Sequence, residues 1–136
     1  MNNFNGLQKW LKDHNITEVE CIVSDLTGMA RGKIMPASKF CDDAGIRLPE
    51  SVLVATVTGD YLDDYSMIDP AEIDIYLKPD ANAAHLLPWA SEPTAQIIHD
   101  CYDIHGELID LAPRTVLRKV LKLYEDMGLT PIVAPE

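Results

Sequence analysis

The chain has 136 residues, the size of one ordinary domain, and a formal net charge of −11 at pH 7. Its 11 lysine and arginine residues are spread thinly, whereas a phosphate-binding surface needs them clustered, so nucleic acid is excluded as a partner. No apolar run approaches the roughly 20 residues that a membrane-spanning helix needs, and we expect no membrane partner. Three cysteines without a CxxC pair, and no signal-peptide pattern, predict a cytoplasmic protein.

A β-hairpin is the first element that the sequence predicts clearly. Apolar and polar side chains alternate from 19 to 24, as they do on a strand with one buried face, and a short amphipathic helix over 4–14 precedes this strand. Asp25 and Gly28 then supply a turn, because an aspartate carboxylate can accept backbone N–H groups and glycine adopts positive φ without strain. Residues 29–35 form the return strand.

The middle of the chain is predicted to contain a helix over 36–44, a bend at 48–50 and a strand over 51–58 that stops at Gly59. The stretch 60–74 holds six carboxylates and a proline but little apolar periodicity, so we expect a long exposed loop. This stretch lacks the internal glycine of an EF-hand, which excludes that calcium motif.

The second half of the chain is predicted to hold a short strand over 73–77 and a hairpin over 95–109. The apolar loop between them contains Trp89, which we assign to the core. A helix over 113–127 is the clearest element, because a proline suits its first turn and apolar residues recur on one face. Residues 129–136 look like the start of a further strand without a partner, so we expect a second domain of a larger protein to follow.

Five short motifs, in this order and spacing, resemble the amino-terminal domain of the glutamine synthetase family. They are Val-Ser-Asp-Leu-Thr-Gly at 23–28, Arg-Gly-Lys-Ile-Met-Pro at 31–36, Asp-Ile-Tyr-Leu-Lys-Pro-Asp at 74–80, Leu-Pro-Trp at 87–89 and Pro-Arg-Thr-Val-Leu at 113–117. The resemblance implies an α+β fold for residues 1–112, with a β-grasp-like mixed sheet and a covering helix. It also implies that residues 113–136 form a linking helix and the first strand of a catalytic domain.

The resemblance further implies an activity, the ATP-dependent ligation of glutamate to an amine in glutamine biosynthesis and nitrogen metabolism. In the family, ATP phosphorylates the γ-carboxylate of glutamate, and an amine then displaces phosphate from the acyl phosphate. Mg²⁺ or Mn²⁺ neutralises the phosphate charge and is held by carboxylates. Glu136 resembles the first half of the family's metal-binding Glu-x-Glu pair and is our candidate metal ligand. The 136 residues alone are expected to be inactive and to bind no cofactor.

One wall of the amine site is also implied to lie in this chain. Family members that use ammonium place an Asp-Gly-Ser-Ser motif in the pocket of a neighbouring subunit, within a homo-oligomer that is often a dodecamer. The matching region here has Thr56, Thr58, Gly59 and Asp60, without an aspartate before the glycine or a serine pair after it. With this difference from the Asp-Gly-Ser-Ser motif, and with its hairpin motifs, the chain is most similar to the branch that uses putrescine or other polyamines. Ammonium stays open as a substrate, because Asp60 and its acidic neighbours could serve either amine.

Two further interpretations concern charged residues. Arg31 and Lys33 lie two positions apart on one strand and are assigned to the sheet surface or to a subunit contact. The acidic segment from Asp60 to Asp74 allows an alternative function of another class, a free-standing β-grasp interaction module that binds a basic protein surface. Such a module is expected to end at a completed element, and this sequence does not.

Overall fold

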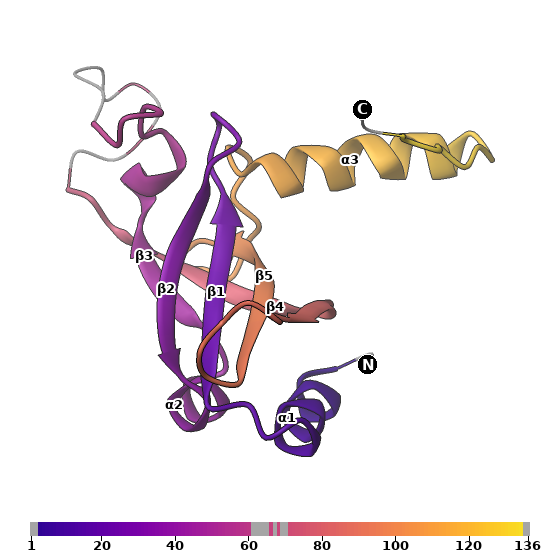
Figure 1. Ribbon diagram of the computed structural model, residues 1–136. Coiled ribbons are helices and arrows are strands. Elements are labelled where there is room, and N and C mark those ends of the chain that lie inside the picture. Colours follow the sequence, from indigo (N-terminus) through magenta and orange to yellow (C-terminus); the bar gives the residue numbers. More distant parts are fainter. Residues whose placement is uncertain (1–2, 61–65, 67, 69–70, 135–136) are drawn as a thin grey trace.

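A five-stranded mixed sheet lies at the centre of the computed structural model, which describes residues 3–60, 66, 68 and 71–134 (Figure 1). The strand order is β2-β1-β5-β4-β3, with β1 and β5 parallel and the other neighbouring pairs antiparallel. The elements in chain order are α1 (Phe4–Asp13), β1 (Glu18–Ser24), β2 (Ala30–Pro36), α2 (Ala37–Asp43), β3 (Ile46–Pro49), the 3₁₀ helix η1 (Glu50–Leu53), β4 (Asp74–Leu86), β5 (Thr94–Tyr102) and α3 (Pro113–Asp126). The predicted α+β class with a mixed sheet is confirmed.

The core lies on one face of this sheet. Apolar side chains at alternate positions of β1, β4 and β5 point to it, and α1 and α2 cover one end, whereas η1 and the segment 109–112 cover the other. Phe40 of α2 is fully buried, and its ring lies 5.8 Å from that of Phe4 and edge-on to His99 at 6.1 Å, measured between ring centroids. The two helices therefore sit at the end of the sheet opposite the β1–β2 turn (Figure 1).

The predicted β1–β2 hairpin is present, and a glycine lets its strands come close together. Cys21 pairs with Lys33 and Ile22 with Gly32 in an antiparallel register. A Cβ atom added to Gly32 would lie 1.8 Å from the carbonyl oxygen of Cys21, so no side chain fits at this position without displacing backbone. Gly28, with φ of +82°, takes the left-handed conformation that the turn requires.

The prediction of a strand over 51–58 is wrong. The edge strand β3 comes earlier, at Ile46–Pro49, so the expected bend at 48–50 is the end of β3 and the start of η1. Leu53, Val54 and Ala55 are buried in succession, which does not fit a strand with one covered face, where burial alternates. These residues close the end of the core instead of pairing with a neighbour.

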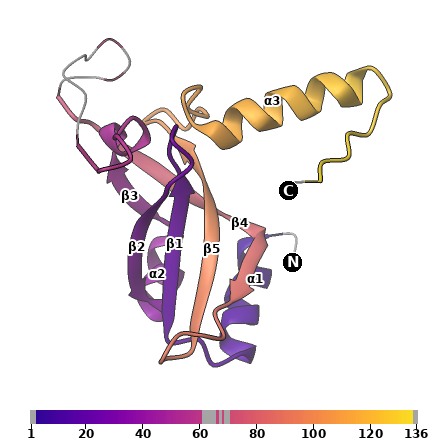
Figure 2. The same ribbon diagram turned by 45° about the horizontal axis from the view of Figure 1, so that its top comes forward.

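Other expectations for the second half need correction as well. β4 continues past the predicted end at Leu77, because a register shift between Pro79 and Ala84 accommodates the proline. Trp89 is 78% exposed rather than buried, since the preceding Leu87 takes the core position. The expected strand over 129–136 is absent from its described part, 129–134. The helix over 113–127 is confirmed as α3, which extends away from the sheet (Figures 1 and 2).

Candidate functional site

The four residues assigned to an amine-site wall lie together in a tight loop after η1. The backbone of this wall loop, residues 56–60, closes on itself: the Thr56 N–H donates to the Asp60 carbonyl and the Gly59 N–H to the Thr56 carbonyl, both at 2.9 Å. Gly59 has φ of +89°, a conformation that residues with a side chain rarely adopt. The hydroxyl of Thr58 donates to the Asp60 carboxylate at 2.6 Å.

The side chains of the wall loop form a directed series of hydrogen bonds. Because Thr58 gives its only hydroxyl proton to Asp60, the Thr56 hydroxyl must donate its own to Thr58, at 2.9 Å. Thr56 in turn accepts the Asp60 N–H at 3.0 Å. The Asp60 side chain is thus oriented by its neighbours while the residue stays exposed. An exposed, oriented carboxylate of this kind is able to accept hydrogen bonds from a protonated amine.

An ion pair beneath the wall loop joins it to the β1–β2 hairpin. Asp25 is completely buried, and its Oδ1 accepts the N–H groups of Thr27 and Met29, both at 2.9 Å, and the Thr27 hydroxyl at 2.7 Å. Its Oδ2 accepts Arg31 Nε at 2.8 Å. The Arg31 guanidinium also donates through Nη2 to the Thr56 carbonyl at 2.8 Å. One arginine therefore connects a buried carboxylate to the first residue of the loop.

These contacts set the charge state of Asp25. Burial by itself raises the pKa of this carboxyl, but the hydrogen bonds from Thr27, Arg31 and Met29 more than offset it and hold the pKa below its ordinary value. Asp25 is consequently ionised at neutral pH, and its negative charge is balanced by Arg31. Arg31, which we assigned to the sheet surface or to a subunit contact, is not a solvated surface charge, because its side chain is 21% exposed and paired with Asp25. Lys33 is exposed and donates to the carbonyl of Arg47 at 2.9 Å.

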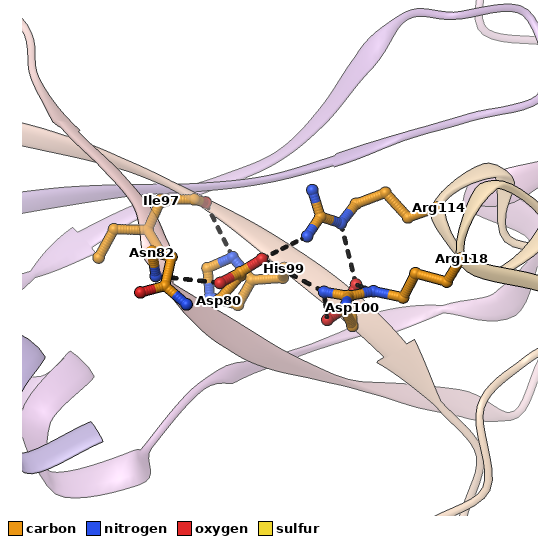
Figure 3. Close-up of polar contacts among 7 residues, drawn as sticks. All are labelled: Asp80, Asn82, Ile97, His99, Asp100, Arg114 and Arg118. Atoms are coloured by element: carbon orange, nitrogen blue, oxygen red, sulfur yellow. Dashed lines mark hydrogen bonds and ion pairs between the residues drawn. The ribbon is translucent and has the colours of Figure 1, made fainter. Parts of the chain in front are cut away.

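A second cluster of charges, which the sequence analysis missed, fixes the start of α3 on the sheet. Figure 3 shows Arg114 and Arg118 of α3 reaching onto Asp80 of β4 and Asp100 of β5. Arg114 pairs with both carboxylates, and Arg118 does the same at 2.7 Å from Asp100 and 3.2 Å from Asp80. Asp80 lies at the irregular part of β4 and also accepts the Asn82 N–H at 3.0 Å. We call these two arginines and two aspartates the α3 clamp.

The clamp carries much of the attachment of α3, because the apolar side chains of the helix are exposed. Those with at least 39% exposure are Val116, Leu117, Val120, Leu121, Leu123 and Tyr124. Thr115 is the one residue of α3 buried in the described structure. A surface helix ordinarily attaches to its domain by burying an apolar face, and α3 does not do so in the described structure. Here paired charges supply the attachment.

His99 lies close to the clamp in Figure 3 but does not belong to it. Its side chain points to the core, on the opposite sheet face from the adjacent Asp100. Burial lowers the pKa of His99 to about 4, so the imidazole is neutral at pH 7. Its Nδ1 lies 2.9 Å from the carbonyl of Ile97, which can only accept, so the proton is on Nδ1.

Removing one carboxylate from the clamp is expected to loosen α3. In Asp100→Asn the shape is kept but the charge facing Arg114 and Arg118 is lost, and we expect about 1.5–3 kcal/mol less stability against urea. The matched control is Asp110→Asn, whose carboxylate pairs with Lys119 at an exposed site and should cost below about 1 kcal/mol. Equal losses in the two variants would show that the clamp is no stronger than an ordinary surface ion pair.

Several residues of interest fall outside the described part of the chain. The candidate metal ligand Glu136 is one of them, as are Asp63, Asp64 and Asp69 of the acidic segment. Among the described residues there is no group of three or more histidine, cysteine, aspartate or glutamate side chains that could hold a metal ion. In the same residues, no helix has the length and apolar character needed to cross a membrane.

Comparisons with known proteins cover nearly the whole chain. No protein-family model matches it. It is 30% identical over 127 residues to a glutamate–isopropylamine ligase from a Pseudomonas species, which covers 90% of this chain and 28% of the relative. A glutamine synthetase from Archaeoglobus fulgidus is 28% identical over 134 residues, 93% of this chain and 25% of the relative. A solved structure of GmaS in complex with ADP superimposes with a TM-score of 0.72 at 25% identity, over 93% of this chain and 26% of that one.

The chain is therefore similar to glutamine synthetases and to related glutamate–amine ligases over most of its own length. It spans about a quarter of the length of these relatives and is similar to the family's amino-terminal domain and its γ-glutamylamine synthetase branch.

Four of the five motifs that carry the family resemblance meet in pairs in the fold. Asp25 of the first motif binds Arg31 of the second, and Asp80 of the third binds Arg114 of the fifth. Charges separated along the sequence thus become partners, which no single motif reveals. Arg118 and Arg114 are spaced by four positions and share one helix face, which is the signal that could have pointed to the clamp.

Proposed function

We propose that this chain is the amino-terminal domain of an ATP-dependent ligase that joins glutamate to an amine. Residues 1–112 form the β-grasp-like domain, and residues 113–136 link it to a catalytic domain. The observation that carries the proposal is the 30% identity to a glutamate–isopropylamine ligase over 90% of this chain. The match to GmaS in complex with ADP supports it, because that fold is shared at a TM-score of 0.72. A free-standing interaction module is not favoured, since the relatives just described are ligases.

The wall loop is proposed to line the amine pocket of a neighbouring subunit in a homo-oligomer. Its exposed side chains Thr58 and Asp60 are held in place by hydrogen bonds within the loop, so they need no reordering when an amine binds. Asp60 supplies the negative charge that binds a protonated amine. We propose an organic amine, an alkylamine or a polyamine such as putrescine, in preference to ammonium.

The remaining parts of the reaction belong to the rest of the protein. ATP and Mg²⁺ or Mn²⁺ would activate the glutamate carboxylate as an acyl phosphate, and Glu136 is proposed as one of several carboxylates that hold the metal. A single carboxylate does not hold Mg²⁺ in a protein without further ligands. We propose that the enzyme acts in the cytoplasm and that no catalytic residue lies in the described part of this chain.

The proposal is tested by phosphate release from ATP, using the full-length protein with glutamate and one amine at a time. We expect release with isopropylamine or putrescine at a lower KM than with ammonium. Release that needs no glutamate, or no release with any of the three amines, would contradict the ligase assignment. A KM for ammonium below those of both organic amines would contradict the proposed amine class.

Asp60→Asn in the full-length enzyme is expected to raise the KM for the amine about tenfold or more, because a charge-assisted hydrogen bond is worth about 1.5–3 kcal/mol. The asparagine oxygen still accepts from Thr58, so the loop keeps its shape. Asp42→Asn is the control, an exposed carboxylate on α2 at the far end of the sheet. The KM for glutamate should stay unchanged in both variants, and an equal amine KM in both would exclude Asp60 from the pocket.

A further inference from the structure

The position of the wall loop, as distinct from its shape, depends on a contact from outside it. Hydrogen bonds among Thr56, Gly59 and Asp60 close the loop on itself but do not attach it to the sheet. The Arg31 guanidinium makes that attachment, from a strand 25 positions earlier in the sequence. Before the loop, a backbone bond from the Leu26 N–H to the Leu53 carbonyl, at 2.9 Å, ties the same hairpin to the end of η1.

The chemistry of the link requires an arginine. Nε binds Asp25 while Nη2 binds the Thr56 carbonyl, both at 2.8 Å, so two N–H donors of one planar group hold two partners at a fixed separation. A lysine ammonium is a single point of charge and cannot reproduce this fork. Gly59 lies against the same guanidinium: a Cβ added there would be 3.8 Å from Nη1. The planar group therefore holds the start of the loop and lies near its glycine.

We propose that Arg31 is a positioning residue for amine recognition, which fixes the wall loop relative to the sheet without touching substrate. The inference rests on the proposed function of the loop. Asp25 holds the guanidinium in place and cancels its charge, so that Asp60 determines the local charge presented to an incoming amine. Without the two hydrogen bonds of Arg31, the wall loop keeps its shape but can shift relative to the sheet. Amine binding and the preference among amines then weaken, while glutamate binding is retained.

The test compares Arg31→Lys with Lys33→Gln in the full-length enzyme. The first keeps the charge opposite Asp25 but loses the link to Thr56, and we expect the amine KM to rise between about ten- and a hundredfold, since displacements near 1 Å have effects of that size. The glutamate KM should stay within a factor of two of wild type, and the ratio of kcat/KM for isopropylamine over ammonium should fall. Lys33→Gln, on the same strand, should change none of these values.

A second variant protects the test against a folding failure. Asp25→Asn combined with Arg31→Gln removes both charges together, so no buried charge is left unpaired, and the Thr56 link is still lost. An amine KM at the wild-type value in a folded variant of either kind would overturn the inference, as would a matching rise in the amine and glutamate KM values. If the wild-type enzyme itself releases no phosphate with glutamate and any amine, the proposed function fails instead.

Discussion

Gly32→Ala is expected to destabilise the protein by about 3 kcal/mol or more, at the top of the range for overpacked sites. The added Cβ would meet the Cys21 carbonyl oxygen at 1.8 Å and the Ile22 Cα at 3.1 Å. Both are backbone atoms of β1, so no side-chain rotation relieves the clash. The strands must separate, which breaks hydrogen bonds between β1 and β2 and removes Arg31 from its partner Asp25.

Urea unfolding followed by circular dichroism measures this loss, with Gly106→Ala as the matched control. Gly106 has φ of +84° but no atom within 4 Å of an added Cβ, so its replacement costs only the conformational strain, roughly 1–2 kcal/mol. The difference between the two variants isolates the effect of close strand packing. A loss at Gly32 no larger than at Gly106 would mean that β2 moves away from β1 at little cost.

The sequence predicts those elements whose pattern is local. The hairpin of β1 and β2 and the helix α3 show a period in their own residues, and α2 is bounded by Pro36 and Gly45; all three are present. The segment after Pro49 shows no such local pattern. Its residues are buried because they pack on the end of the core, and they do not pair with a strand. The prediction that Trp89 is buried was wrong for a similar reason. Whether a loop tryptophan is covered depends on elements that lie far away in the sequence.

The candidate site was predictable only in part. The four wall-loop residues were identified by family resemblance and do lie together, but their support by Arg31 depends on β2 lying beside the loop. That contact arises from tertiary structure, so the charge pattern alone placed Arg31 on the surface. The α3 clamp likewise depends on tertiary structure, because its aspartates come from β4 and β5 and its arginines from α3.

Asp25→Asn is expected to lower the stability of the protein by about 3 kcal/mol at pH 7. The amide oxygen can replace Oδ1 as acceptor for Thr27 and Met29, but the amide nitrogen cannot accept from Arg31, which loses its partner. Breaking a buried ion pair from one side costs about 3–5 kcal/mol. The lower figure applies because Arg31 remains 21% exposed and water can solvate part of its charge.

The effect of this substitution depends on pH with a definite sign. The pKa of Asp25 is lower in the folded protein than its ordinary value of 3.8, so the folded state favours the ionised form. The stabilisation that this gives is complete above pH 3.8 and is lost as the pH falls through the lower, folded pKa. Wild type and Asp25→Asn should therefore differ by a constant amount between pH 5 and 8 and converge under more acidic conditions.

The measurement is urea unfolding of both proteins from pH 8 downward, since the difference between them cancels the titration of every other group that the substitution leaves alone. Thr27→Val is the control, because it removes one hydrogen bond to Asp25 while the ion pair with Arg31 remains. It should cost about 1 kcal/mol, with a much weaker convergence at acidic pH. A gap between wild type and Asp25→Asn that widens toward acidic pH would contradict the lowered pKa, and with it the hydrogen bonds from Thr27, Arg31 and Met29 as its cause.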